Sequence, residues 1–412
     1  MSQRIRFLQI KYKFADLQFS DLSVESELNE LMALARRAHE VTLITATSTR
    51  LCASKAMTVQ GLSLEPVFLR KNVRILSWLL FQMIVFWRLL QTIHRRDVLV
   101  LDYSVVPVLY PLLALRRLLS HYPVLVLRVT SNPVETEGSV RSWALCLFWI
   151  ISLKLAGGLF DRIYFITPMM GWEFSRVLKL PSSKIGTWPS TVNTRLFDPR
   201  SPQLSSRIRS LRREFALSGR MVVLHHGVLS KARGIMETVE AFALLKKRSV
   251  KAILFLLGDG PARAELRKYI RSNDLEEYVR IHGPVPYSDV PMFIATCDVG
   301  IVPLPNNSWW RHQCPTKLLE YLAMNKPVIV SDLPGHRWVL GNAPIAQYLK
   351  GTGAEEIANG LTKAMKNFEI FSRRQGRRIS YAFSGERVAQ MLEQDVLLAL
   401  RGHRGTRIAA DC

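Results

Sequence analysis

The chain has 412 residues, and its 56 Lys and Arg residues outnumber its 33 Asp and Glu residues, which gives a formal net charge of +23. This length predicts two or three domains, and a hydrophobic content of 48% excludes disordered, collagen-like and low-complexity chains. The five cysteines form no CxxC pair, so we expect neither a disulfide scaffold nor a structural zinc site, and a reducing compartment fits. The charge calls for an anionic partner. No nucleic-acid partner is expected, because the sequence has no basic helix or aromatic-interleaved motif typical of such binding.

Strands and helices alternate along the first half of the chain. The predicted strands are 5–10, 41–45, 98–101, 124–129 and 163–167, and the predicted helices are 25–37, 75–93 and 143–155. The first residues, MSQRIRFLQI, lack the long apolar stretch of a signal peptide and fit a first strand. This alternation predicts a mainly parallel sheet with helices on both faces.

Two stretches are apolar enough to suggest contact with lipid. Residues 75–87 and 142–153 carry no charged side chain, and both are shorter than the roughly 20 residues that a membrane-spanning helix needs. Residues 50–130 hold 11 basic and 3 acidic side chains, a net of +8. Two interpretations stay open: buried helices of an α/β domain, or an interfacial patch whose aromatic side chains face anionic lipid. The basic flanks favour peripheral membrane binding.

A second alternating series follows a turn-rich loop at 188–200. The predicted strands are 221–225, 252–257, 279–282, 299–303 and 327–331, and the predicted helices are 235–247, 262–272, 287–295, 316–324 and 354–366. An amphipathic helix is predicted for 384–400. These periods match another doubly wound domain, in which ligands bind outside the carboxyl ends of the strands.

Two turns at predicted strand ends could approach a phosphate. Gly227 follows a strand and Arg233 precedes a helix, so both backbone and a guanidinium can reach an anion there. The run Gly258-Asp259-Gly260 begins like a phosphate loop, but Arg263 stands where a dinucleotide fingerprint has its third Gly. An ordinary solvated turn explains each of these two runs when it is taken alone.

A third turn lies at the start of the predicted helix 316–324. Pro315 suits the first turn of a helix, and the N–H groups of Thr316 and Lys317 would point at an anion. Lys317 and Glu320 are three residues apart and share one face, so a cation for phosphate lies beside a carboxylate for a sugar diol. A surface ion pair would explain these charges, but not three such turns at the strand ends of one sheet.

With these motifs, the second half resembles the donor domain of the GT-B-fold glycosyltransferases, and specifically of the retaining glycosyltransferase family 4. The matching runs, in family order and spacing, are HHGVLSKARGIMETVEAFALL, LFLLGDGPARAEL, VRIHGPVPYSDVPMFIATCDVGIVPL and CPTKLLEYLAMNKPVIVSDLPG. The resemblance implies an α/β GT-B fold of two doubly wound Rossmann-like domains with a cleft between them. It places an acceptor-binding domain at 1–198, a nucleotide-sugar donor-binding domain at 199–378, and a helix at 379–412 that returns towards the first domain.

The resemblance also implies roles for the matching residues. Arg233 takes the place of the basic residue that neutralises the donor diphosphate, and Glu320 that of the glutamate which hydrogen-bonds the donor ribose. The expected catalytic residues are Arg233, Lys317 and Glu320. The expected donor-binding residues are Gly227, Lys231, Arg233, Gly258, Gly260, Pro284, Val285, Thr316, Lys317, Leu318 and Glu320.

The sequence departs from the family pattern at several positions. His312 stands eight residues before Glu320, where the first glutamate of the family's E-x7-E motif would be, and Val228 replaces a common second phosphate-binding Arg. Thr130 and Ser131 stand where many members place a histidine beside the reacting sugar. Thr130, Ser131 and His312 are therefore the acceptor-side candidates, and we expect a divergent enzyme.

The implied function is retaining transfer of a hexosyl group from a UDP- or GDP-sugar to a lipid-linked or oligosaccharide acceptor, in cell-envelope polysaccharide or glycolipid assembly. No cofactor and no metal are expected, because Arg233, Lys317 and a helix N-terminus meet the charge of the leaving diphosphate. The expected location is cytoplasmic, at the inner face of the cell membrane. Two alternatives stay open: a non-catalytic GT-B nucleotide-binding or scaffold protein, and a GT-B nucleotide-sugar epimerase.

Overall fold

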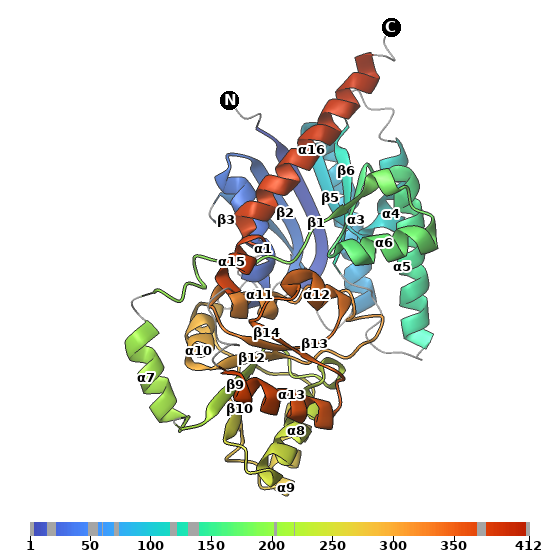
Figure 1. The fold of residues 1–412 in the computed structure, drawn as a ribbon. Helices are drawn as coiled ribbons and strands as arrows, with labels where there is room; N and C mark the ends of the chain where they lie inside the picture. The colour runs from blue at the N-terminus through green and yellow to red at the C-terminus, as the bar shows by residue number, and fades with distance from the viewer. Residues whose placement is uncertain are drawn as a thin grey trace. The chain divides into compact units, whose positions relative to one another are not determined.

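The computed structural model describes residues 4–14, 22–47, 57–59, 61–69, 74–115, 122–130, 140–201, 204–217, 219–368 and 376–408. The chain divides into two compact units: unit 1 comprises Met1–Thr191 and Gly385–Cys412, and unit 2 comprises Val192–Ser384. The division thus falls after Thr191 where the sequence-based boundary is 198, and the C-terminal part of unit 1 begins at Gly385 where the sequence-based boundary is 379. Each unit has a largely parallel sheet flanked by helices, so the predicted α/β class with two Rossmann-like domains is confirmed (Figure 1).

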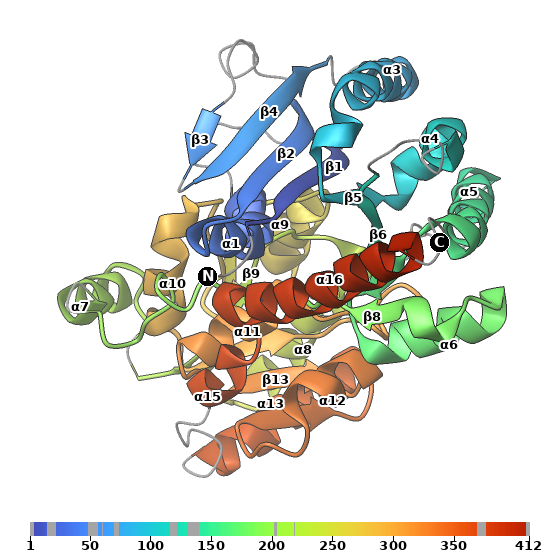
Figure 2. The same ribbon diagram turned by 90° about the horizontal axis from the view of Figure 1, so that it is seen from above.

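The sheet of unit 1 has the strand order β3-β4-β2-β1-β5-β6-β7-β8, in which β3 runs antiparallel to β4 and the other neighbouring strands described pair in parallel. The strands are β1 (Arg6–Phe14), β2 (Glu40–Thr47), β3 (Met57–Val59), β4 (Leu62–Phe68), β5 (Val98–Asp102), β6 (Val124–Val129), β7 (Arg162–Phe165) and β8 (Ile185–Thr187). The helices are α1 (Leu22–Arg36), α3 (Arg74–Thr92), α4 (Val106–Ala114), α5 (Val140–Leu159), α6 (Pro168–Leu178) and α16 (Gly385–Ile408). Figure 2 shows α1 and α16 on one face of this sheet and α3, α4 and α5 on the other.

Helices on both faces explain why the central strands of unit 1 are apolar along their length. β5 reads VLVLD and β6 reads VLVLRV, and their Val and Leu side chains are buried. On one face the core includes Val388, Leu392 and Val396 of α16, which recur at every fourth residue. One stripe of the C-terminal helix is therefore part of the core of unit 1.

Charged side chains also fix α16 within unit 1. Glu393 is 5% exposed; it accepts a hydrogen bond from Nε of Arg37 at 2.7 Å and lies 3.1 Å from Nε2 of the buried His39. Asp395 pairs with Nε of Arg162 at 3.3 Å and accepts a hydrogen bond from the Tyr164 hydroxyl. One turn of α16 is thus held by polar partners in addition to the apolar stripe.

α3 buries one face and exposes another. It covers the apolar run 75–87 and continues beyond it, and its Ser77, Phe81, Val85 and Leu89 are at most 2% exposed. The other face exposes large apolar side chains: Leu76, Leu79, Leu80, Met83, Trp87 and Leu90. Within the described residues, the stretch Leu76–Arg95 is long and apolar enough to cross a membrane by length and composition, and 33% of it is buried.

This helix corrects the expectation that the segment is too short to span, because the helix does not stop at the charged residue that ends the run. Neither interpretation, a buried helix or an interfacial patch, describes α3 fully. One side of the helix packs into unit 1, and the other exposes large apolar side chains. The second run, 142–153, lies within α5, where Leu147 and Ile151 are exposed while Ser152 and Leu153 are buried.

The sheet of unit 2 is parallel throughout its described strands and has the order β11-β10-β9-β12-β13-β14. The strands are β9 (Met221–His226), β10 (Ala252–Leu257), β11 (Val279–Ile281), β12 (Val299–Val302), β13 (Val328–Ser331) and β14 (Ala346–Leu349). The helices are α7 (Leu204–Glu214), α8 (Ile235–Lys247), α9 (Arg263–Ser272), α10 (Val290–Thr296), α11 (Thr316–Ala323), α12 (Pro334–Leu340), α13 (Ala354–Lys366) and α15 (Gly376–Tyr381). α11 and α12 lie on one face of the sheet and α8 and α13 on the other (Figure 1).

The two ends of unit 2 meet. The N–H of Val192 donates to the carbonyl of Phe383 at 3.0 Å, and Val192 forms an isolated parallel bridge with Ser384. The chain therefore enters and leaves unit 2 at neighbouring points.

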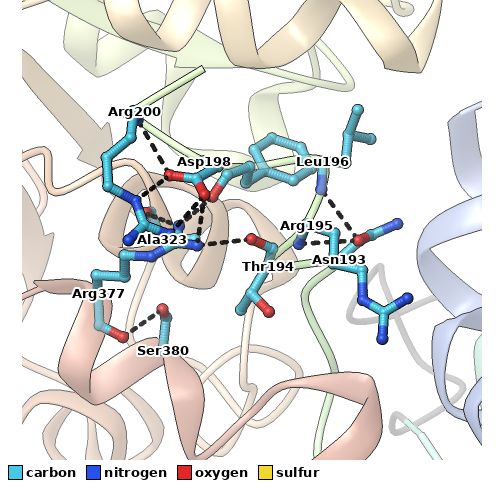
Figure 3. Close-up of polar contacts among 10 residues, drawn as sticks. Asn193, Thr194, Arg195, Leu196, Asp198, Arg200, Ala323, Arg377 and Ser380 are labelled. Atoms are coloured by element: carbon cyan, nitrogen blue, oxygen red, sulfur yellow. Dashed lines mark hydrogen bonds and ion pairs between the residues drawn. The ribbon is translucent and has the colours of Figure 1, made fainter. Parts of the chain in front are cut away.

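Arg377 of α15 holds the segment that follows the entry point (Figure 3). Its guanidinium donates to the carbonyls of Phe197 at 2.6 Å and Thr194 at 2.8 Å, and to that of Ala323, the last residue of α11, at 3.1 Å. It also pairs with Asp198 at 3.3 Å. A single side chain thus ties the entry segment to the end of α11.

Candidate active site

The strand order of unit 2 reverses between β9 and β12. Numbered within the unit, the order is 3-2-1-4-5-6, that of the dinucleotide-binding doubly wound sheets, whose ligands bind at the carboxyl ends of the strands where the order reverses. β9 ends at His226 and β12 at Val302. Gly227 and the loop from Pro303 to α11 therefore lie at this switch point.

The loops after β9 and β10 are joined backbone to backbone. The N–H of Leu229 donates to the carbonyl of Asp259 at 2.9 Å. A Cβ on Gly258, where φ is +138°, would lie 2.1 Å from the carbonyl oxygen of Gly227, and one on Gly260 would lie 2.3 Å from that of Leu229. Gly258 and Gly260, predicted to bind the donor, thus allow the two loops to pack on each other.

Lys317 points towards Gly227 from the first turn of α11. Gly227 has φ +106°, and a Cβ there would lie 3.6 Å from Nζ of Lys317. The same Nζ lies 3.3 Å from Nε2 of His225, and since an ammonium can only donate, this nitrogen is the acceptor. Lys317 is 8% exposed and His225 is fully buried, so the lysine is held against the strand end.

The N-terminus of α11 lies at the same place. Pro315 occupies the N-cap position, and no side chain caps the helix. The N–H of Leu318 donates to the carbonyl of Pro315 at 3.0 Å, and the Leu318 side chain is fully buried. This differs from the expectation for Leu318, because its N–H is already used. The N–H groups of Thr316 and Lys317 are the donors at the open end of the helix.

Glu320 lies one turn further along α11, on the same face as Lys317. Its carboxylate is 3% exposed and accepts a hydrogen bond from the Tyr287 hydroxyl at 2.7 Å on Oε1. Nε2 of His226 lies 3.3 Å from Oε2. The predicted neighbours Lys317 and Glu320 are therefore together, but both are buried and each has a partner from another element.

Burial dominates the protonation of this cluster. It lowers the pKa of Lys317 to about 7, with the charge of Arg233 as the next cause. It raises the pKa of Glu320 to about 7, although the Tyr287 hydroxyl and Lys317 oppose the shift. It also lowers the pKa of His225 and His226, with Lys317 as the next cause in both. The two histidines are therefore neutral at physiological pH.

Arg233 supplies the second cation. It ends a short 3₁₀ turn before α8, and its guanidinium lies over the ring of Trp310 at 4.9 Å, a cation–π contact that fixes its direction. Its charge acts on Lys317 and on His225. Two positive side chains that repel each other are thus held near a glycine and an open helix N-terminus, which is an arrangement suited to a di-anion.

The other predicted site residues have the following surroundings. Lys231 forms an exposed ion pair with Glu265 at 2.7 Å. Pro284 is exposed and Val285 half-buried in the loop after β11. His312 is half-buried in the loop before α11. In unit 1, Thr130 follows β6, and Ser131 lies outside the described residues.

Four residues of the site were not predicted from sequence: His225, His226, Tyr287 and Trp310. The doublet His225-His226 at the end of an otherwise apolar strand was a usable signal, because consecutive polar residues are unusual in a buried parallel strand. Tyr287 begins a short 3₁₀ turn and Trp310 lies in a loop, and nothing local in the sequence connects them to Glu320 or Arg233.

Comparisons with known proteins agree with this fold. Residues 208–379 match the family described as Glycosyl transferases group 1. The chain is 23% identical over 201 residues to an alpha-D-kanosaminyltransferase of Streptomyces kanamyceticus, a match that covers 49% of this chain and 50% of that protein. It is 25% identical over 230 residues to a GDP-mannose-dependent alpha-(1-6)-phosphatidylinositol dimannoside mannosyltransferase of Mycobacterium tuberculosis, with 56% of each covered. The chain thus spans about half the length of these curated relatives.

A solved structure extends the likeness over both units. The crystal structure of Anabaena HepE in complex with UDP aligns with a TM-score of 0.70 and 15% identity, and covers 95% of this chain and 99% of that chain. At this identity the likeness concerns the fold. The chain therefore has the fold of the GT-B glycosyltransferases, and its residues 208–379 match the group 1 glycosyl transferases.

Proposed function

We propose that the protein is a nucleotide-sugar-dependent glycosyltransferase of family 4 that transfers a hexosyl group with retention of anomeric configuration. The cluster of the half-buried Arg233 with the buried Lys317 and Glu320 carries the proposal. Two cations match a diphosphate and a carboxylate matches a ribose diol, so the cluster fits a nucleoside diphosphate. Its place at the switch point of a 3-2-1-4-5-6 sheet supports the same ligand class.

The chemistry proposed is stabilisation of a leaving group. The bond between the anomeric carbon and the diphosphate oxygen breaks, and negative charge grows on that oxygen. Arg233, Lys317 and the N-terminus of α11 meet this charge without a metal. The acceptor hydroxyl attacks from the side that the leaving group vacates, which retains the configuration, and its proton passes to the departing phosphate. No protein side chain is then needed as a base.

The donor is proposed to be a UDP- or GDP-sugar. The HepE structure holds UDP, and the mycobacterial relative is named as GDP-mannose-dependent. A thermal-shift panel of UDP-, GDP- and ADP-sugars tests this, because a ligand that binds only the folded state raises the unfolding temperature. Transfer from the donor that gives a shift is then measured with lipid-linked and oligosaccharide acceptors.

The outcome of this panel separates the proposal from its rivals. Binding followed by release of the nucleoside diphosphate and glycosylation of an acceptor supports the transferase. Tight binding with neither hydrolysis nor transfer would identify a non-catalytic nucleotide-binding protein. Conversion of the donor sugar into an epimer without acceptor would identify an epimerase.

The acceptor is proposed to be lipid-linked or a saccharide at a membrane, and the protein to bind the cytoplasmic face of an anionic membrane. The exposed apolar face of α3 supports this, because Met83 is 59% and Trp87 62% exposed. Arg95 is exposed just beyond the helix, and residues 50–130 carry a net +8. Apolar side chains beside basic ones suit an interface with anionic headgroups.

A further inference from the structure

We infer that His226 is a positioning residue for Glu320: it holds the carboxylate in the orientation in which that carboxylate accepts the hydroxyls of a donor ribose. The inference deepens the proposed function and rests on it. It concerns a side chain to which the family resemblance assigns no role.

The carboxylate of Glu320 lies between two groups from different elements. The Tyr287 hydroxyl, from the turn before α10, donates to Oε1 at 2.7 Å. His226, the last residue of β9, brings Nε2 to 3.3 Å from Oε2. One partner thus lies beside each oxygen, so rotation of the carboxylate about its last torsion would break the Tyr287 bond and move Oε2 away from His226.

Nε2 of His226 lies close to Oε2 of Glu320 but is not aligned for a hydrogen bond with it in this structure. Its side chain is 9% exposed, and within the described part of the chain Nε2 has no aligned hydrogen-bond partner. A buried ring nitrogen without a bond is costly, and contacts of this kind are often long or poorly aligned in an unliganded site and tighten when the ligand arrives. Oε2 of Glu320, at 3.3 Å, is the acceptor that such tightening would use.

The ring of His226 is itself fixed by packing. It meets the ring of Tyr321 edge to face, with centroids 5.0 Å apart. The Tyr321 hydroxyl in turn donates to the carbonyl of Leu224 at 2.8 Å. Tyr321 is the residue after Glu320 on α11, so the same helix turn carries both the carboxylate and the ring that orients its partner.

A neutral histidine suits this task better than a cation. A neutral N–H directs the carboxylate without cancelling the charge that a diol needs as its acceptor. The cation nearest to Glu320 along the helix is Lys317, three residues earlier, and its ammonium faces Gly227. The cluster thereby separates the group that directs the carboxylate from the group that attracts phosphate.

The test compares two ligands that differ only at the ribose. Binding of a nucleoside diphosphate and of its 2′,3′-dideoxy analogue is measured by calorimetry for the native protein, H226L, H226Q and E320Q. If His226 acts through Glu320, H226L lowers the preference for the ribose by about tenfold, and leaves the affinity for the dideoxy analogue almost unchanged. H226Q retains the preference, because its amide nitrogen takes the place of Nε2. The double variant H226L/E320Q shows no further loss beyond E320Q.

Equal weakening of both ligands by H226L would overturn the inference, because it would indicate general damage to the site. A further loss in H226L/E320Q would overturn it too, by showing that the ring acts on the ribose directly. Should H226L not fold, H226N replaces it, since its shorter amide cannot reach Oε2. If the native protein binds no nucleoside diphosphate at all, the proposed function fails, and this inference fails with it. Binding with an undiminished ribose preference in H226L leaves the proposed function standing and overturns the inference alone.

Discussion

At the scale of single residues, two basic side chains in one short turn have different surroundings. Lys231 is exposed and paired with Glu265, whereas Arg233 lies over Trp310 and acts on Lys317. Both were predicted to bind the donor. The two side chains differ in how firmly they are directed, because an exposed ion pair holds Lys231 only weakly whereas the Trp310 ring fixes the direction of Arg233.

The first prediction uses this matched pair. R233A is expected to lower kcat/KM for sugar transfer by about 10²–10³, the cost of removing one group that stabilises developing charge. K231A is expected to change it by less than about threefold. Steady-state transfer assays with equal amounts of folded protein measure both. Near-native turnover in R233A would end its assignment as the diphosphate-binding residue.

The second prediction concerns pH. Lys317 loses its proton above its pKa of about 7, and Glu320 gains one below its pKa of about 7. Diphosphate binding needs the ammonium and ribose binding needs the carboxylate, so affinity for a nucleoside diphosphate is expected to peak near neutrality and to fall on both sides.

Calorimetric titrations between about pH 5.5 and 8.5 follow this profile. E320Q should remove the fall on the acid side and K317M the fall on the alkaline side. An affinity that stays constant across this range in the native protein would contradict the assignment of either group.

Some of the site could be predicted from sequence and some could not. Lys317 and Glu320 are neighbours on a helix, so their shared face followed from their spacing alone. His226 and Tyr287 are 320 − 226 = 94 and 320 − 287 = 33 residues from Glu320, and only the folded sheet brings them to it. Sequence periodicity indicates which side of a helix or strand is buried. It does not indicate which side chain from a distant part of the sequence contacts that side.

At the scale of helices and strands, unit 2 was the easier half. α8, β10 and α13 have the predicted bounds, because a Gly or a charged residue marks both ends of each element. The hairpin strands β3 and β4, the strand β14 and the helix α12 were not predicted. Each is seven residues or shorter and, unlike the six apolar residues of β10, each contains polar residues, so neither a long period nor an apolar block marks it.

The third prediction compares two glutamates of α16. Glu393 is buried against Arg37 and His39, whereas Glu386 pairs with Arg36 at 3.2 Å and its side chain is 44% exposed. E393Q is expected to lower the free energy of unfolding by about 2 kcal/mol, since it weakens charge-assisted hydrogen bonds in a buried place. E386Q is expected to lower it by less than about 1 kcal/mol.

Urea unfolding followed by circular dichroism measures both variants. If E386Q proved as destabilising as E393Q, burial would not explain how much each polar contact of α16 contributes to the free energy of unfolding. Equal stability of E393Q and the native protein would leave the apolar stripe and the contacts of Asp395 as the anchors of this helix.

At the scale of the whole molecule, the net charge of +23 has more than one origin. Arg233 and Lys317 belong to the cluster proposed to bind the donor diphosphate. Many other basic residues are paired, as Arg162 is with Asp395 and Arg377 with Asp198. The basic excess around α3 is the part proposed to face a membrane.

The fourth prediction tests that surface. The variant M83E/W87E is expected to abolish flotation with vesicles that contain anionic phospholipid, because it places charge on the apolar face of α3. L398E is the matched control, since Leu398 is 61% exposed on α16, across the sheet from α3 (Figure 2). It should float like the native protein, and both variants should keep the native unfolding temperature. If M83E/W87E floats normally, α3 is not the membrane-binding surface.

The meeting of the two ends of unit 2 has a consequence for how such a chain can be rearranged. Val192 and Ser384 are joined by a backbone bridge, so the whole of unit 2 is a continuous insert whose two junctions lie at one spot. A genetic exchange of residues 192–384 for the corresponding segment of another such protein would require no new linker. The remaining segments, 1–191 and 385–412, would still pack together, because side chains of α16 are part of the core of unit 1. The donor specificity proposed for unit 2 would then move with this single segment.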